Sequence, residues 1–172
     1  MLQHYTRAMD ALYWTCMTVA GTCLVVITLI IPWGVFTRYV LNSAASWPEP
    51  MAILLMIVFS FLSAAICYRD ALHIGVLLVP MMLTGVARTA LGWLVELCMI
   101  GTNLFMLWWG IKLVATTWHQ VIADFPLLSV GITYLPIPVG GAITALFVIE
   151  RLWKGNLFDQ PAAQAVSHIA TE

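Results

Sequence analysis

Long stretches without a charged residue are the feature that most constrains this sequence. Residues 50–68 form a run of nineteen without Asp, Glu, Lys or Arg, and Glu49 and Arg69 bound the run on its two sides. At 1.5 Å per residue a helix of this length measures about 28 Å, close to the roughly 30 Å hydrocarbon thickness of a bilayer. The run is therefore predicted to cross a membrane.

Three further segments predict crossings of the same kind, because each is at least as long and together they hold only one charged residue, Glu96. The fold class predicted is an all-α integral membrane protein with four transmembrane helices. A single membrane domain is expected over residues 1–155, followed by a polar tail over residues 156–172. The predicted spans are residues 11–37, 47–68, 89–111 and 127–149.

The composition agrees with a membrane protein and argues against other classes. Hydrophobic residues make up 62% of the chain and charged residues 9%, whereas a soluble domain carries about 25% charged residues. Four spans leave no room for a soluble enzymatic domain. The net charge of −1 does not favour a nucleic-acid partner. The sequence contains no P-loop and no zinc-binding H-E-x-x-H motif, so neither an enzyme nor a cofactor is predicted.

Residues 71–87 are also uncharged, but they are interrupted by glycine and proline and make a poor crossing. With four spans and the N-terminus inside, five of the seven Lys and Arg residues lie inside, as membrane proteins prefer; a fifth span would erase this bias. We therefore expect residues 71–87 to form an interfacial helix on the cytoplasmic side, between the second and third spans, and both termini to be inside. The five inner basic residues are Arg7, Arg69, Arg88, Arg151 and Lys154.

One face of the third predicted span carries small and polar side chains. This face is expected to point into the protein, because small residues allow helices to approach closely and polar residues avoid lipid. The start of the fourth span contains Pro136 and Pro138 and is expected to be irregular and covered by protein. The residues of the third-span face are Thr89, Gly92, Glu96, Asn103 and Gly110.

Glu96 is the most conspicuous single residue, since a charge within a span costs about 2.5–3.5 kcal/mol on insertion scales. Its carboxylate must be paired, protonated or hydrated. Arg69 and His73 are the nearest expected partners, and either a structural pair or a proton relay would fit. His73 and His119 are expected on opposite sides of the membrane, so they could not bind one haem iron together.

Other charged residues lie at the ends of the spans. Arg38 and Glu49 close the first two spans on the same side, where they could form an ion pair or be solvated separately. Arg69 and Arg88 flank residues 71–87, where they could bind lipid phosphates or contact a partner protein.

Several motifs in this order resemble those of one transporter family. They are Arg38-Tyr39, Asn42, Trp47-x-Glu49, Phe59-x-Phe61, Ala64-Ala65, Arg69-x-x-x-His73-Ile74 and the run over residues 129–138. Over about residues 10–153 the chain resembles the small membrane subunit of tripartite ATP-independent periplasmic (TRAP) transporters. Members of the family often have a second acidic residue where this chain has Pro50.

The resemblance implies a transporter of three components in the bacterial inner membrane. A periplasmic solute-binding protein captures an organic acid, such as a sialic acid or a C4-dicarboxylate, and a large polytopic membrane subunit imports it with sodium. The small subunit packs against the large one among the membrane lipids, helps dock the binding protein, and has no substrate site of its own. Candidates for structural or partner contacts are Arg38, Trp47, Glu49, Arg69, His73, Arg88, Glu96, Pro136 and Pro138.

Two other readings stay open at this point. One is a self-sufficient small transporter in which Glu96 from several copies forms a proton-coupled site. The other is a haem- or quinone-binding membrane anchor of a respiratory complex.

Overall fold

The computed structural model describes residues 2–43, 45–70, 86–122 and 125–154. Most of the predicted interfacial segment (residues 71–85) and the predicted polar tail (residues 156–172) lie outside the described residues. The placement of residues 71–87 in the interface and the location of both termini inside therefore stay predictions.

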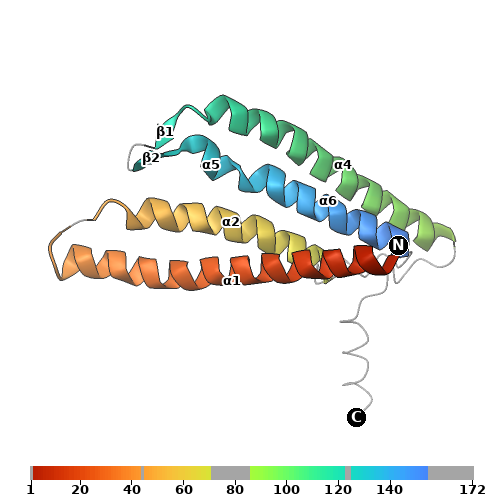
Figure 1. Ribbon diagram of the computed structural model, residues 1–172, viewed down its shortest axis with the longest axis horizontal. Coiled ribbons are helices and arrows are strands. Elements are labelled where there is room, and N and C mark those ends of the chain that lie inside the picture. Colours follow the sequence, from red (N-terminus) through yellow and green to blue (C-terminus); the bar gives the residue numbers. More distant parts are fainter. Residues whose placement is uncertain (1, 44, 71–85, 123–124, 155–172) are drawn as a thin grey trace, which may run out of the picture.

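The described part of the chain consists mainly of four long helices, as predicted (Figure 1). Each contains an apolar stretch long enough to cross a bilayer, although α1 and α4 extend beyond the predicted spans at both ends. A short helix, α5, precedes α6. The helices are α1 (Leu2–Tyr39), α2 (Pro48–Arg69), α4 (Val86–Thr117), α5 (Val130–Tyr134) and α6 (Pro136–Lys154).

The residues between α1 and α2 favour the end of one helix and the start of the next. After α1 the chain turns at Asn42, whose φ of 48° lies in the left-handed region that asparagine tolerates better than most residues. Pro48 opens α2, where its missing N–H has no helical acceptor in any case. Glu49 in the first turn and Arg69 in the last turn both complement the helix dipole.

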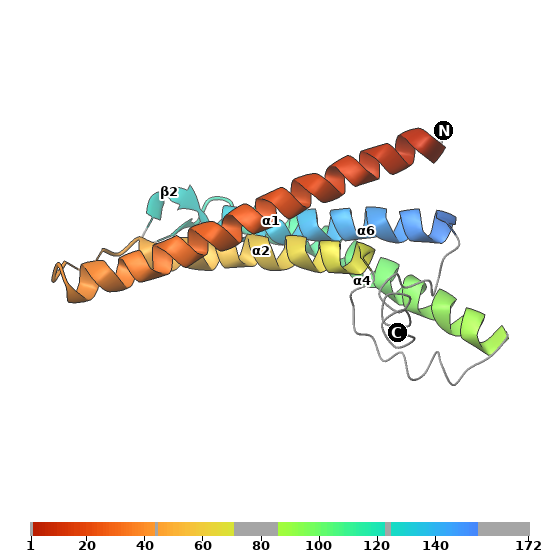
Figure 2. The ribbon, with the colours of Figure 1, turned by 90° about the horizontal axis from the view of Figure 1, so that it is seen from below.

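The helices form an open row whose order differs from the chain order. α1 packs against α2, α2 against α6, and α6 against α4, so that α1 and α4 form the two edges (Figure 1). The start of α1, the end of α2, the start of α4 and the end of α6 lie toward the same end of the row, which we call the Arg69 end (Figure 1). The opposite end, with the α1–α2 turn, is the Arg38 end. Figure 2 shows α1 crossing its neighbours at an angle and the first turns of α4 extending beyond α2.

The core lies where α1, α2 and α6 meet. Its most buried large side chains, Phe147 and Val148, come from α6 and pack with Met9, Ala65 and Tyr68. By contrast, large apolar side chains cover the outside of the row, and all eight tryptophans are among the exposed residues. Tryptophan is enriched at membrane interfaces, so this exposure suits a chain surrounded by lipid and other membrane proteins.

Small residues bring α2, α4 and α6 together. A Cβ atom added to Gly110 would lie 2.9 Å from Pro138 Cδ, and one added to Gly140 would lie 2.9 Å from Phe61 Cβ. The expected inward face of the third span is confirmed at Gly92, Glu96, Asn103 and Gly110, which are all buried. Thr89 is exposed, because it lies in the first turns of α4 that extend past α2 (Figure 2).

The helix of the fourth predicted span begins three residues after the predicted start at about residue 127. Residues 127–129 belong to β2 (Phe125–Ser129), which pairs antiparallel with β1 (Val121–Ile122). The helix begins only at Val130, where the Ser129 hydroxyl accepts a hydrogen bond from the Gly131 N–H at 3.1 Å.

The expected irregular start of this span is confirmed as the break between α5 and α6. Pro136 and Pro138 have no N–H to donate to the preceding helical turn, which interrupts the helical hydrogen bonds at this point. Pro138 is buried, Pro136 is half-buried and Leu135 is exposed, so protein covers the break on one side.

Candidate functional site

Charged side chains from all four long helices gather at the Arg69 end. We define the charged cluster as Asp10 and Tyr13 near the start of α1, Tyr68, Arg69 and Asp70 at the end of α2, Glu96 on α4, and Glu150 and Arg151 on α6. Each long helix runs in the direction opposite to the long helix before it in the chain. Residues far apart in the sequence therefore lie at the same depth.

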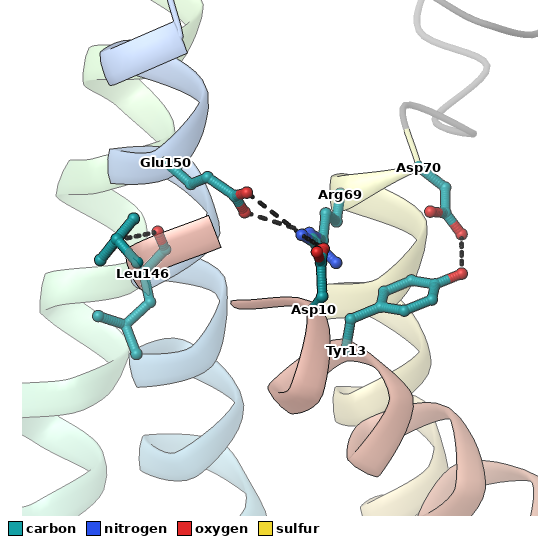
Figure 3. A network of polar contacts seen from close by, with 7 residues as sticks. Asp10, Tyr13, Arg69, Asp70, Leu146 and Glu150 are labelled. Atoms are coloured by element: carbon teal, nitrogen blue, oxygen red, sulfur yellow. Dashed lines mark hydrogen bonds and ion pairs between the residues drawn. The ribbon is translucent and has the colours of Figure 1, made fainter. Parts of the chain in front are cut away.

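Arg69 lies at the centre of one half of the cluster (Figure 3). Its Nε and Nη2 donate hydrogen bonds to the two carboxylate oxygens of Glu150 at 3.1 and 3.2 Å, and Nη2 also donates to Asp10 Oδ1 at 2.6 Å. The guanidinium carbon lies 5.1 Å from the ring centroid of Tyr13 and 5.3 Å from that of Phe147, within the range of a cation–π interaction. Arg69 thereby joins α2 to both α1 and α6.

Tyrosines on α1 add two further links to the neighbouring helices. The Tyr13 hydroxyl donates to Asp70 Oδ2 at 2.8 Å, as Figure 3 shows, and the Tyr5 hydroxyl donates to the carbonyl oxygen of Leu146 at 3.4 Å. The first turns of α1 are therefore attached to the end of α2 and to α6.

Glu96 lies in the other half of the cluster and is only 2% exposed. The Tyr68 hydroxyl donates a hydrogen bond to Glu96 Oε2, and Arg151 Nε forms an ion pair with Glu96 Oε1 at 3.3 Å. The Arg151 guanidinium carbon also lies 5.6 Å from the centroid of the Tyr68 ring. Glu96 thus links α4 to α2 and α6.

The expectation that Arg69 would pair with Glu96 is therefore wrong, whereas a contact between His73 and Glu96 stays a prediction. Arg69 binds Glu150 and Asp10 instead, and His73 lies outside the described residues. Successive residues of a helix point about 100° apart around its axis, so Tyr68 of α2 faces Glu96 while the adjacent Arg69 faces Glu150 and Asp10.

The cluster holds four carboxylates and two guanidinium groups, a formal charge of −2. The two most buried carboxylates, Glu96 and Glu150, each have a guanidinium partner, which offsets the cost of removing their charges from water. In the part of the chain that the structure describes, every buried side-chain nitrogen and oxygen has a hydrogen-bond partner. Chemically, this arrangement cross-links four helices and fixes their relative positions.

Sequence reasoning missed the roles of Asp10, Tyr68, Glu150 and Arg151. A signal was present, because Glu150-Arg151 directly ends an apolar span and so had to lie at the same membrane level as Arg69. What the sequence did not reveal is which helix stands beside which.

The Arg38 end carries three of the sequence candidates around a groove between α1 and α2. Arg38 and Glu49 both line this groove, which has a volume of about 480 Å³, and Trp47 is exposed beside Pro48. No ion pair joins Arg38 to Glu49, although the structure describes both side chains. Of the two arrangements considered for this pair, the structure therefore has separate charges.

Of the remaining candidates, the structure describes the two prolines but not the side chain of Arg88. Pro138 packs against Gly110 of α4, and Pro136 follows the break before α6. Arg88 lies in the first turn of α4, and its side chain is outside the described part of the structure. Within the described ranges, no group of three or more His, Cys, Asp or Glu side chains could hold a metal ion.

Four membrane-capable helices joined by ion pairs define a multi-pass membrane protein. The family described as "Tripartite ATP-independent periplasmic transporters, DctQ component" matches residues 27–156. The chain therefore belongs to the DctQ family, the small membrane component of TRAP transporters, which confirms the resemblance found in the sequence. This is a family of transporter components and not of enzymes. No curated protein matches the chain.

Proposed function

We propose that this chain is the scaffolding subunit of a sodium-driven TRAP transporter in a bacterial inner membrane. A large polytopic membrane subunit would carry the organic acid and the sodium ions, and a periplasmic solute-binding protein would deliver the acid. The small subunit would support the large one and help dock the binding protein. Membership of a tripartite transporter family supports this division of labour.

The proposal rests on one observation: the polar groups inside the row form hydrogen bonds and ion pairs within the chain. Glu96 is held by Tyr68 and Arg151, the Asn103 amide donates to the Met99 carbonyl at 2.7 Å, and the Thr144 hydroxyl donates to the Gly140 carbonyl at 2.8 Å. A solute pathway needs polar groups that face a cavity and exchange partners. These groups are committed to intramolecular bonds, as suits a support.

The outward surface supports a protein partner within the membrane. Because the helices form an open row, each has exposed apolar side chains that none of the other described helices covers; on α4 these include Leu97, Leu104, Phe105 and Trp108. Helices associate in membranes by packing such surfaces closely. We infer that the large subunit covers part of the row and that lipid covers the rest.

The distribution of basic residues supports an orientation with the Arg69 end inside. Residues 71–87 and both termini would then lie on the cytoplasmic side. The Arg38 end, which carries both the α1–α2 turn and the β1–β2 hairpin, would face the periplasm (Figure 1). These two connections are the surfaces that we propose for docking the binding protein.

Co-purification tests the proposal. The tagged chain would be expressed with the large membrane protein and the secreted binding protein encoded beside it, then purified in a mild detergent. We expect a stable complex with the large membrane protein, and no complex with an unrelated polytopic protein produced at the same level. Elution of the chain alone, or only with copies of itself, would overturn the proposal.

A further inference from the structure

We propose that the groove between α1 and α2 at the Arg38 end binds one zwitterionic phospholipid with a primary ammonium headgroup, phosphatidylethanolamine. The inference does not depend on the proposed transport role, because every residue that forms the groove belongs to this chain.

A close helix contact creates the groove. A Cβ atom added to Gly34 would lie 3.1 Å from Pro48 Cβ, so α1 and α2 touch at this point. Beside the contact the helices enclose about 480 Å³, within the usual range for small-molecule sites. The aliphatic side chains that line this space are Ile27, Ile31, Val35, Ala52, Ile53 and Met56.

The length of the groove suits an acyl chain. Ile27 and Arg38, which both line it, are eleven residues apart on α1, or about 16 Å along the helix axis. One half of a bilayer has a hydrocarbon thickness of about 15 Å. The apolar walls therefore extend over the depth of one leaflet, with the charged residues at the end of the groove near the membrane surface.

The two charges at this end select the headgroup. The Arg38 guanidinium matches a phosphate, to which arginine can donate two parallel hydrogen bonds. The Glu49 carboxylate matches an ammonium group, which has three N–H donors. Since neither side chain forms an ion pair with a described residue, both are available to a ligand.

This pair of charges discriminates among lipids. An anionic phospholipid such as phosphatidylglycerol would be attracted by Arg38 but has no ammonium for Glu49. Phosphatidylcholine has a cation, but its methylated nitrogen has no N–H to donate to the carboxylate. Only phosphatidylethanolamine satisfies both residues among these three.

Native mass spectrometry of the full chain tests the assignment. The chain would be reconstituted in nanodiscs with equal amounts of phosphatidylethanolamine, phosphatidylcholine and phosphatidylglycerol, then released with its tightly bound lipid. We expect one retained phosphatidylethanolamine per chain, favoured about tenfold over the other two, as an added charge-assisted hydrogen bond would give.

Three variants separate the parts of the site. Arg38→Gln should reduce retention of phosphatidylethanolamine about tenfold. Glu49→Gln should keep a bound phospholipid but abolish the preference for ethanolamine over choline. Ala52→Trp should fill the groove and expel the lipid with both charges in place. Lys112→Gln is the matched control, because Lys112 is an exposed cation toward the same end, stacked on Trp108 and Trp109.

Several results would overturn the proposal. They are preferential retention of phosphatidylglycerol, unchanged retention in both Arg38→Gln and Ala52→Trp, and loss of the lipid when the large membrane subunit binds, which would make the groove a protein contact. Helical circular dichroism and a single elution peak establish that each variant is folded. Should Ala52→Trp not fold, the two charge variants decide the outcome.

Discussion

Two hydrogen bonds, of 3.1 and 3.2 Å, join the Arg69 guanidinium to the carboxylate of Glu150, although 81 residues separate the two in the chain. The same guanidinium also binds Asp10. One side chain therefore holds the end of α2 to the end of α6 and to the start of α1. The stability of the row should depend on this contact more than on any exposed charge.

Replacing Glu150 with glutamine should lower the free energy of unfolding by about 3 kcal/mol, because it leaves a mostly buried Arg69 without its main counter-charge. The side chain of Glu150 is 5% exposed and that of Arg69 is 17% exposed. Thermal unfolding of the purified protein in detergent, followed by tryptophan fluorescence, would measure the loss as a lower melting temperature.

Asp10→Asn is the matched control, since Asp10 binds the same guanidinium but its side chain is 61% exposed. Exposed ion pairs contribute about 0–1 kcal/mol, so this variant should melt close to the wild type. Equal losses in the two variants would show that burial does not determine the strength of the contact.

A double-mutant cycle on Glu96 and Arg151 should reveal strong coupling. Each single change to glutamine removes one charge of a mostly buried ion pair, whereas the double change removes both charges. We expect the double variant to unfold at a higher temperature than the sum of the single losses predicts, with a coupling energy of about 1–3 kcal/mol. Strict additivity would mean that the two groups do not interact in the membrane.

The helix contact at Gly140 should be intolerant of even one methyl group. A Cβ atom there would lie 2.9 Å from Phe61 Cβ, so Gly140→Ala forces α6 away from α2 and should cost about 1–3 kcal/mol. Gly21→Ala is the control, because a Cβ at Gly21 meets no atom within 4 Å. Melting temperatures in detergent compare the two, and similar losses would argue against close packing at Gly140.

The helices could be predicted from the sequence because a bilayer requires an uncharged segment of a certain length, and charged residues mark where such a segment ends. The span predicted from the uncharged run between Glu49 and Arg69, residues 47–68, became α2 with a difference of one residue at each end. The inward face of α4 was also predictable, since Gly92, Glu96, Asn103 and Gly110 recur at helical spacing.

The neighbours in the row were not predictable in this way, because periodicity shows which face is buried but not which helix covers it. Tyr68 and Arg69 are adjacent in the chain, yet Tyr68 binds Glu96 while Arg69 binds Glu150. This division follows from the angle of about 100° between successive residues of a helix, which points the two side chains at different neighbours. The β1–β2 hairpin was missed because a two-residue strand paired with one that contains Pro126 has almost no periodic signal.

Glu96→Gln distinguishes a structural carboxylate from a proton-coupling one. In the complete three-component transporter we expect this variant to retain uptake with an unchanged dependence on pH, in proportion to the amount of complex that assembles. Uptake per assembled complex, measured across pH in proteoliposomes, is the quantity to compare. Loss of uptake in a fully assembled complex would assign a transport role to Glu96.

The central claim is that this chain supports a transporter without conducting solute itself. Sodium-driven uptake of a radiolabelled organic acid into proteoliposomes tests it, using the chain alone, the large membrane subunit with the binding protein, and all three together. We predict no uptake by the chain alone and full uptake only with all three components. Saturable uptake by the purified chain alone would contradict the account.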